Sequence, residues 1–211
     1  MPSFRRWTLL PAALAALVGP ACATGERPTL VPVAALADPP ADTVASHLER
    51  ARSADFTATY DIVPSTTGLA TKATVAKRGD RLRVTIGDVV FTTDGTDAST
   101  CRGPDQVCTD ALDDARVSDL NVTHLFWGPA FTRRLELDAA RRIGPSVGST
   151  AVIADRPAVC VDIVLPSAPM GTGVVTYCAV GDGPLARYFG ADVSIELTSF
   201  SIDVAESALT G

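Results

Sequence analysis

The side chains best suited to chemistry in this sequence are a serine between two glycines and two histidines. Gly144-Pro145-Ser146-Val147-Gly148 matches the G-x-S-x-G pattern of a nucleophile elbow. That elbow needs a strand before the serine, a helix after it and a histidine further along the chain. Here a helical pattern precedes Ser146, a strand pattern follows it, and His47 and His124 both lie upstream. We therefore expect a Gly/Pro loop, no catalytic residue and no enzymatic activity.

The cysteine spacings favour disulfides over a metal site. Six residues separate Cys101 from Cys108 and seventeen separate Cys160 from Cys178. Neither spacing resembles the short knuckle of a structural zinc site. An exported chain is expected to pair its cysteines. We therefore predict the disulfides Cys101–Cys108 and Cys160–Cys178, with no metal and no cofactor.

The second disulfide also predicts a strand register. Val159–Leu165 and Val174–Val180 are apolar, β-branched segments of strand length, and Pro166–Gly173 between them has turn composition. Folding the chain about Pro169 brings Cys160 opposite Cys178. Cross-strand Cβ atoms lie about 4.5–5.5 Å apart, close to what a disulfide needs. A long antiparallel hairpin, cross-linked near its middle, is the expected result.

The N-terminus has the features of an export signal. Arg5-Arg6 precedes the apolar stretch Trp7–Val18, which is shorter than the roughly 20 residues of a spanning helix. Ala21-Cys22-Ala23 fits simple secretion, whereas Gly19-Pro20-Ala21-Cys22 resembles a bacterial lipobox with an unusual Gly19.

Cys22 favours the lipobox interpretation, because the other four cysteines pair with one another. We expect a signal peptide over 1–21 and an extracytoplasmic protein anchored to the bacterial cell membrane through lipid on Cys22. Secretion is the alternative. The Pro-rich residues 22–42 are expected to form an extended tether.

Composition limits the class of protein and its partners. The chain has 211 residues, 46% apolar and 20% charged, which is typical of a globular domain. Its net charge is −6, and loss of Arg5 and Arg6 with the leader makes the mature chain more acidic still. Nucleic-acid binding needs clusters of Lys and Arg, so it is disfavoured. We expect one domain over 43–204, a tail over 205–211 and a monomer.

Hydrophobic periodicity predicts a short helix followed by many strands. Asp42 is the expected N-cap of a helix that buries Val44, Leu48 and Ala51. The period then changes to two, with turns every 8–12 residues. The expected strands are 56–62, 70–77, 81–86, 89–93, a strand ending at 101, 149–153, 159–165, 174–180, 185–189 and 193–203.

The last expected strand has an irregular pattern. Val193, Ile195 and Leu197 are odd-numbered apolar positions, whereas Phe200, Ile202 and Val204 are even-numbered. A β-bulge at Thr198-Ser199 would keep both sets on one face and would bend the sheet.

The segment Thr109–Ile143 interrupts the strand pattern. Its apolar residues show no alternation, so we expect one or two helices, broken near Gly128-Pro129. The apolar part, which we name the midsegment (Leu125–Leu135), contains Phe126, Trp127 and Phe131. It is expected either to fill the core by packing on the sheet or to cover a cavity above a concave sheet.

The order of these elements resembles the LolA/LolB-type and mycobacterial LppX/LprG-type envelope lipoproteins. The matching features are Cys22, the Pro-rich tether, the helix leading into Phe56-Thr57-Ala58-Thr59-Tyr60, the meander, the helical insertion and the final strand Ala191–Leu197. The resemblance implies an α+β fold, in which an antiparallel curved β-sheet (half-barrel) is covered on its concave side by an N-terminal helix and a helical insertion. It also implies acyl chains carried in the enclosed space.

From this resemblance and the alternation we predict a protein that binds a lipid or another hydrophobic ligand and carries it across the cell envelope. The alternative is a non-enzymatic scaffold or sensor module that binds an envelope protein. The residues expected to line the hydrophobic ligand cavity are Tyr60, Ile62, Val84, Ile86, Val89, Phe91, Phe126, Trp127, Phe131, Leu135, Ile163, Leu165, Ile195 and Leu197.

Overall fold

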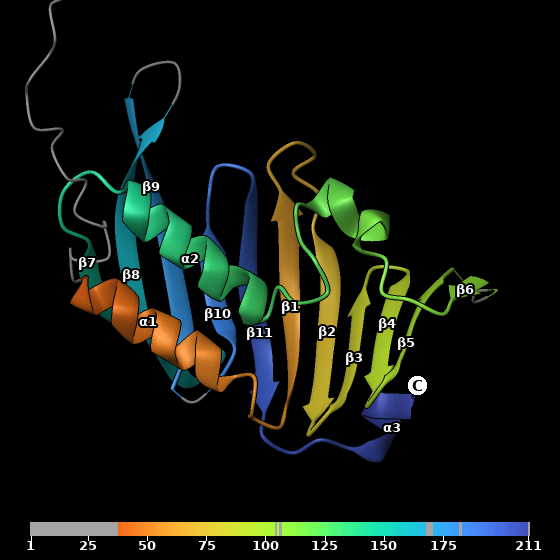
Figure 1. Ribbon diagram of the computed structural model, residues 1–211. Helices are drawn as coiled ribbons and strands as arrows, with labels where there is room; N and C mark the ends of the chain where they lie inside the picture. The colour runs from red at the N-terminus through yellow and green to blue at the C-terminus, as the bar shows by residue number, and fades with distance from the viewer. Residues whose placement is uncertain (1–37, 104, 106, 168–170, 182, 211) are drawn as a thin grey trace, which may run out of the picture. The chain divides into compact units, whose positions relative to one another are not determined.

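The structure is a computed structural model that describes residues 38–103, 105, 107–167, 171–181 and 183–210 (Figure 1). The bounds of its elements are α1 Pro39–Arg50, β1 Phe56–Pro64, β2 Thr71–Arg78, β3 Arg81–Ile86, β4 Val89–Asp94, β5 Asp97–Arg102, β6 Val107–Thr109, the 3-10 helix η2 Asp114–Leu120, α2 Pro129–Arg141, β7 Val147–Ile153, β8 Arg156–Ser167, β9 Gly171–Val180, β10 Leu185–Phe189, β11 Val193–Ser201 and α3 Glu206–Thr210.

The described strands form one open, antiparallel sheet of 11 strands, in the order β6-β5-β4-β3-β2-β1-β11-β10-β9-β8-β7. From the centre, β1 to β6 step outward to one edge. The chain then passes through η2 and α2 to the opposite edge, and β7 to β11 step back until β11 pairs with β1. The predicted α+β class with a curved antiparallel sheet is confirmed.

The expected irregularity lies where β11 pairs with β1. Thr59 is opposite Ser199 and Tyr60 is opposite Leu197, so Thr198 is an extra residue with no partner on β1. The predicted bulge is therefore confirmed. Bulges of this kind bend a strand and increase its twist.

The bulge turns only part of the following sequence toward the core. Phe200 stacks on Phe56 with 6.0 Å between ring centroids. Ile202, which we expected on the same face, is 67% exposed, because β11 ends at Ser201. Val204 is buried, but in a separate small cluster. The prediction for these last two positions was wrong because the strand has no pairing partner beyond its end.

Cys160 lies opposite Cys178 in the β8–β9 hairpin, and the two form the expected disulfide. The turn predicted over Pro166–Gly173 is too long, because the two strands continue to pair past Pro166. The pairing of β7 with β8 ends at Val147 and Asp162, so Pro166 has no partner on the β7 side of β8. Proline is tolerated at such positions, since no ladder partner is lost there.

The other expected disulfide joins Cys101 of β5 to Cys108 of β6. It closes a hairpin whose outer strand has only three residues. Both predicted pairings are therefore present, and disulfides are typical of proteins that fold outside the cytoplasm.

Helix α1 begins earlier than predicted. Asp38, and not Asp42, is the N-cap, and its carboxylate accepts a hydrogen bond from the Ala41 backbone N–H at 3.4 Å. Pro39 and Pro40 form the first turn, although the sequence placed them in the tether. Proline is favoured there because the first helical residues need no N–H donor.

We expected one or two helices in the segment Thr109–Ile143, and it contains two, η2 and α2. Asp113 caps η2 by accepting from the Ala115 backbone N–H at 3.2 Å. Gly128 is the N-cap of α2, and Pro129 occupies its first turn. The expected break at Gly128-Pro129 is therefore the start of α2.

A short helix, α3, lies in the segment that we expected to be a tail. Leu209 of α3 belongs to a small cluster with Ala76 and Val204, separate from the main core. Glu206 forms ion pairs with Arg81 at 2.5 Å and with Arg78 at 3.0 Å. Ala76 and its buried neighbour Val75 point to opposite faces of β2, so α3 packs on the face away from the main core.

Helices α1 and α2 lie side by side across one face of the sheet, over β8 and its neighbours (Figure 1). Val44, Leu48 and Ala51 of the α1 region are buried there, as predicted. The main core fills the layer between these helices and the sheet, and it continues under η2 and the midsegment as far as Phe91 of β4. This layer contains the candidate site.

Candidate functional site

The candidate site is the contact between the midsegment and the sheet. Gly128 and Pro129 start α2 and so place Phe126 and Trp127 just before the helix, against the strands. The Leu185 backbone N–H at the start of β10 donates to the Trp127 carbonyl at 2.6 Å. This hydrogen bond ties the entry to α2 directly to the sheet.

Four aromatic contacts join the midsegment to the strands, all with steeply inclined rings. Their centroid distances are 4.9 Å for Phe126–Tyr60, 5.5 Å for Trp127–Phe56, 4.8 Å for Phe131–Tyr188 and 6.4 Å for Phe131–Tyr177. Inclined aromatic pairs at such distances contribute about 0.5–1.5 kcal/mol each beyond the burial of their area.

The residues predicted to line a cavity all belong to or pack against one continuous core cluster. All of them except Leu165 are buried, and Tyr60, Ile62 and Phe126 have no exposed surface. Other protein atoms therefore fill the space around these side chains. The structure brings the predicted residues together, with the midsegment packed directly on the sheet. Ligand binding by them stays a prediction.

Three polar groups in this contact lack a hydrogen-bond partner among the described residues. They are the Tyr60 hydroxyl on β1, the Tyr188 hydroxyl on β10 and the Trp127 Nε1–H of the midsegment. All three side chains are at least 98% buried, and burial raises the pKa of the Tyr60 hydroxyl. An unpaired buried donor costs about 1–3 kcal/mol, so three in one layer are unusual. Each can donate to an acceptor atom that enters this layer.

A buried hydrogen bond also links α2 to the sheet. The Tyr177 hydroxyl on β9 donates to the Asp138 carboxylate at 2.5 Å. Burial, and then this hydrogen bond, raise the pKa of Tyr177 above its ordinary value. Our sequence analysis missed both residues. Asp138 follows Phe131 and Leu135 at i+7 and i+3, on the buried stripe of the helix, and this spacing is the signal that could have found it.

A second polar link lies near the N-terminal half of α2. Arg134 makes a two-pronged ion pair with Asp192, at 2.6 Å and 3.0 Å, and its guanidinium lies 4.5 Å from the centroid of the Tyr188 ring. Burial raises the pKa of the Tyr188 hydroxyl. Bidentate pairs fix orientation as well as adding energy, so this pair helps to orient α2 on the sheet.

The serine of the G-x-S-x-G pattern has a structural contact. Ser146 donates to the carboxylate of Asp38, the N-cap of α1, and Arg142 pairs with the same carboxylate at 3.0 Å. His124 contacts Asp114 at 2.9 Å, and His47 contacts the Gly181 carbonyl. Ser146 thus helps to hold the start of α1 beside the start of β7.

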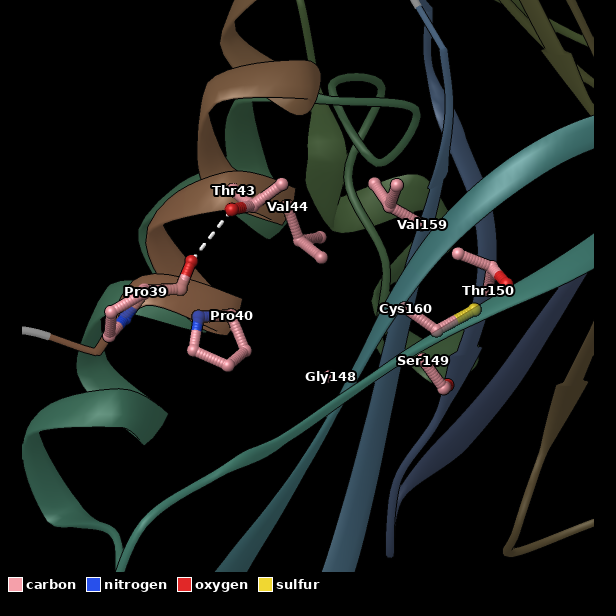
Figure 2. A pocket seen from close by; sticks show the side chains of 9 residues that line it. All are labelled: Pro39, Pro40, Thr43, Val44, Gly148, Ser149, Thr150, Val159 and Cys160. Carbon is pink, nitrogen blue, oxygen red and sulfur yellow. Dashed lines mark hydrogen bonds between the residues drawn. The ribbon is translucent and has the colours of Figure 1, made fainter.

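An apolar surface hollow lies between α1 and the outer strands (Figure 2). It has a volume of about 460 Å³ and is open to solvent. A second hollow of about 480 Å³ shares Thr150 and Val159 with it. We name the two together the α1–β8 groove. Its lining residues are Pro39, Pro40, Thr43, Val44, Gly148–Val152 and Pro157–Cys160, with Gly181 at one end.

The predicted signal peptide, tether and lipid site at Cys22 lie outside the described residues. Within the ranges that the structure describes, no helix has the length and apolar character to cross a bilayer. In the same ranges, no group of three or more His, Cys, Asp or Glu side chains is placed to hold a metal ion.

No family model matches the sequence, and no curated protein matches it. Among solved structures, the chain is similar to one from the Pseudomonas aeruginosa MucA/MucB complex. The identity is 16% and the TM-score 0.46, with 80% of this chain and 61% of that chain covered. For a crystal structure of MucB, the identity is 14% and the TM-score 0.47, with 81% and 62% covered. This chain thus spans about three fifths of those chains.

A further similar structure is a domain described as belonging to an outer membrane lipoprotein-sorting protein from Vibrio parahaemolyticus. The identity is 9% and the TM-score 0.28. The match covers 80% of this chain and 97% of that chain.

Proposed function

We propose that this chain is a non-enzymatic extracytoplasmic lipoprotein, anchored through Cys22, that binds an apolar ligand between the midsegment and the sheet. The ligand class is an acyl chain that carries an ester or carboxylic oxygen. The observation that carries the proposal is the set of three buried, unpartnered donors, which are the Tyr60 and Tyr188 hydroxyls and the Trp127 Nε1–H. All three can donate and the layer around them is apolar, so an acyl ester supplies the acceptor oxygens that they lack.

Ligand entry requires the midsegment to move away from the sheet. The polar links that would open or stretch are the Leu185–Trp127 backbone hydrogen bond, the Arg134–Asp192 ion pair and the Tyr177–Asp138 hydrogen bond. The apolar contacts can be replaced by ligand methylenes, each contributing about 0.8 kcal/mol on burial. The disulfide Cys160–Cys178 would keep the β8–β9 hairpin paired while the helical layer moves.

The test is native mass spectrometry of the Cys22→Ala protein purified from its own host, followed by lipid titration. Tyr60→Phe removes the unpartnered hydroxyl and keeps the ring, so the protein should fold as well as before. Its affinity for an acyl ester should fall roughly 5-fold, the effect of one hydrogen bond of about 1 kcal/mol.

Thr59→Val is the matched control, because it removes a hydroxyl from the neighbouring position of β1 on the opposite face. It should leave the affinity unchanged. The proposal fails if no lipid co-purifies and none binds on titration, or if Tyr60→Phe binds acyl ester as tightly as the parent protein does.

A second candidate function is the binding of a protein partner, which the open α1–β8 groove favours. The groove is mostly apolar and its surface is shallow, so it suits protruding side chains of a protein better than an enclosed lipid. Cross-linking from a photoreactive residue at Val152, which is 76% exposed, should then give one adduct in intact cells. The same residue at Val107, 65% exposed at the opposite edge of the sheet, is the control.

A further inference from the structure

Strand β7 forms one edge of the sheet. Among the described residues it pairs with β8 on one side and with no strand on the other. Its sequence, Val-Gly-Ser-Thr-Ala-Val-Ile, contains neither a charged residue nor a proline. Edge strands are normally short, charged or covered, because their open N–H and C=O groups pair readily with another strand. At the opposite edge β6 has only three residues, whereas β7 has seven and no charge.

The turn after β7 shows which of its backbone groups point away from β8. This two-residue turn has positive φ at both positions, 49° at Ala154 and 58° at Asp155. In such hairpins the two residues that flank the turn exchange both hydrogen bonds, and every second residue along the strand then points its N–H and C=O the other way. The residues that point away from β8 are therefore Gly148, Thr150 and Val152.

The same three positions lie on the helix-covered face of the sheet. A Cβ placed on Gly148 would lie 3.2 Å from the Pro40 side chain of α1 (Figure 2), and side chains two residues apart share a face of a strand. Thr150 and Val152 accordingly line the α1–β8 groove. Val152 is 76% exposed. The edge thus presents an exposed apolar side chain and, four residues before it, a glycine with none.

Two copies of β7 are complementary in an antiparallel register centred on Thr150. That register puts Thr150 opposite its counterpart and Gly148 opposite Val152 of the second copy. All three outward residues of each strand then exchange hydrogen bonds, whereas a shift by two residues leaves one of them unpaired. Each Val152 lies opposite a glycine, next to Pro40 at the groove of the other copy. No like charges meet, because β7 carries none.

We propose that this protein forms a two-fold dimer in which β7 pairs with β7 of a second copy. The two sheets then continue into one another, with the helices of both copies on the same face. β7 is itself the extended, uncharged strand that such an edge requires, and pairing covers the exposed Val152. From the sequence we expected a monomer, because an edge can be recognised only when the strand order is known. The dimer does not depend on ligand binding beneath the midsegment.

Small-angle X-ray scattering of the Cys22→Ala protein measures the association. The scattering mass should rise from the monomer toward the dimer value as the concentration approaches about 1 mM, the Kd of a weak complex. Val152→Asp should weaken dimerisation at least about 10-fold, because each dimer would then hold two unpaired charges in an apolar contact. Val107→Asp charges a valine that is 65% exposed at the opposite edge, and this matched control should leave the Kd unchanged.

A cysteine at the two-fold axis tests the register in intact cells. Opposite residues that exchange both hydrogen bonds have Cα atoms about 5.5 Å apart, which a disulfide can bridge. Thr150→Cys should therefore give a disulfide-linked dimer on non-reducing gels after oxidation with diamide. Ser149→Cys is the matched control. In this register Ser149 lies opposite Ala151 of the other copy and is too far from its own counterpart for a disulfide, so it should not cross-link.

Four results would overturn the proposal. The scattering mass could stay monomeric at every concentration, or Val152→Asp and Val107→Asp could weaken association equally. Ser149→Cys could cross-link as efficiently as Thr150→Cys, which would exclude the register. Thr150→Cys could instead form its adduct with a different protein, and that partner would then be the one that covers the edge. A monomer that still binds acyl ester would remove the dimer and leave the proposed ligand binding in place.

Discussion

At the scale of single residues, the tyrosines of the helix-covered face differ in how their hydroxyls are used. Tyr177 donates to the buried Asp138 carboxylate, whereas Tyr60 has no partner among the described residues. Both rings are buried in the same core cluster. A Tyr→Phe substitution at each position therefore compares two effects on the free energy of unfolding: the loss of a hydrogen-bonded hydroxyl and the loss of an unpartnered one.

We predict that Tyr177→Phe lowers the free energy of unfolding by about 1–3 kcal/mol, because it leaves the Asp138 carboxylate buried without its donor. Tyr60→Phe should leave the free energy of unfolding unchanged or raise it, since no hydrogen bond is lost. Urea unfolding followed by circular dichroism measures both. Equal destabilisation by the two substitutions would contradict this assignment of partners.

At the scale of elements, one carboxylate helps to hold α3 to the sheet, beside a hydrogen bond from Arg83 to the Thr210 carbonyl at 3.3 Å. Glu206 pairs with Arg81 and Arg78, and Leu209 adds a small apolar contact with Ala76. The hydrogen bond with Arg81 is the main reason that the pKa of Glu206 lies below its ordinary value. A carboxyl whose pKa is lowered in the folded state stabilises that state above the unfolded pKa, and the contribution is lost as the pH falls through the lower folded value.

We therefore predict that α3 is fully docked above about pH 4.3, the ordinary pKa of Glu, and detaches as the pH falls further, through the lower pKa that Glu206 has in the folded state. The amide signal of Leu209 in NMR spectra should follow this change while signals from β8 and β9 stay constant. Glu206→Gln should loosen α3 at every pH and abolish the acid transition in that signal. Asp203→Asn, a nearby carboxylate change outside the ion pairs, should leave the transition in place; its disappearance there would contradict the role of Glu206.

At the scale of the whole molecule, the two halves of the open sheet are joined at its centre by the first and last strands, β1 and β11. β1 pairs with β11 across nearly the full sequence, and this joins the β2–β6 half to the β7–β10 half. Such long-range pairing is slow to form, because a large loop must close before its contacts add stability. Helices α1 and α2 cover one face of this sheet over β8 and its neighbours. Because the chain is acidic, we expect attachment to a membrane to depend on lipid and not on charge.

Anchoring is the corresponding prediction for the whole molecule. A diacyl group on Cys22 carries enough methylenes for stable attachment, at about 0.8 kcal/mol for each one buried. Replacing Cys22 with Ala should move the protein from the membrane fraction to the soluble fraction, as measured by fractionation and immunoblotting. Ser3→Ala, a substitution within the leader, is the control and should not change the distribution. A mature N-terminus at Thr24 with unchanged fractionation would instead support secretion.

The sequence by itself determined the features that depend on neighbouring residues. Alternation predicted the strands, turn residues separated them, and the symmetry about Pro169 predicted that Cys160 would meet Cys178. The odd-to-even change in the last strand predicted the bulge at Thr198. These patterns are local, so they can be found without knowing what packs where.

Only the tertiary structure decided which distant segments meet. It shows that β1 pairs with β11, that the N-cap of α1 is Asp38, which contacts Ser146, and that Asp138 accepts a hydrogen bond from Tyr177. It also packed the midsegment directly on the sheet, leaving the Tyr60 hydroxyl buried and unpartnered. Packing depends on the shapes of side chains that lie far apart in the sequence, and periodicity carries no information about those contacts.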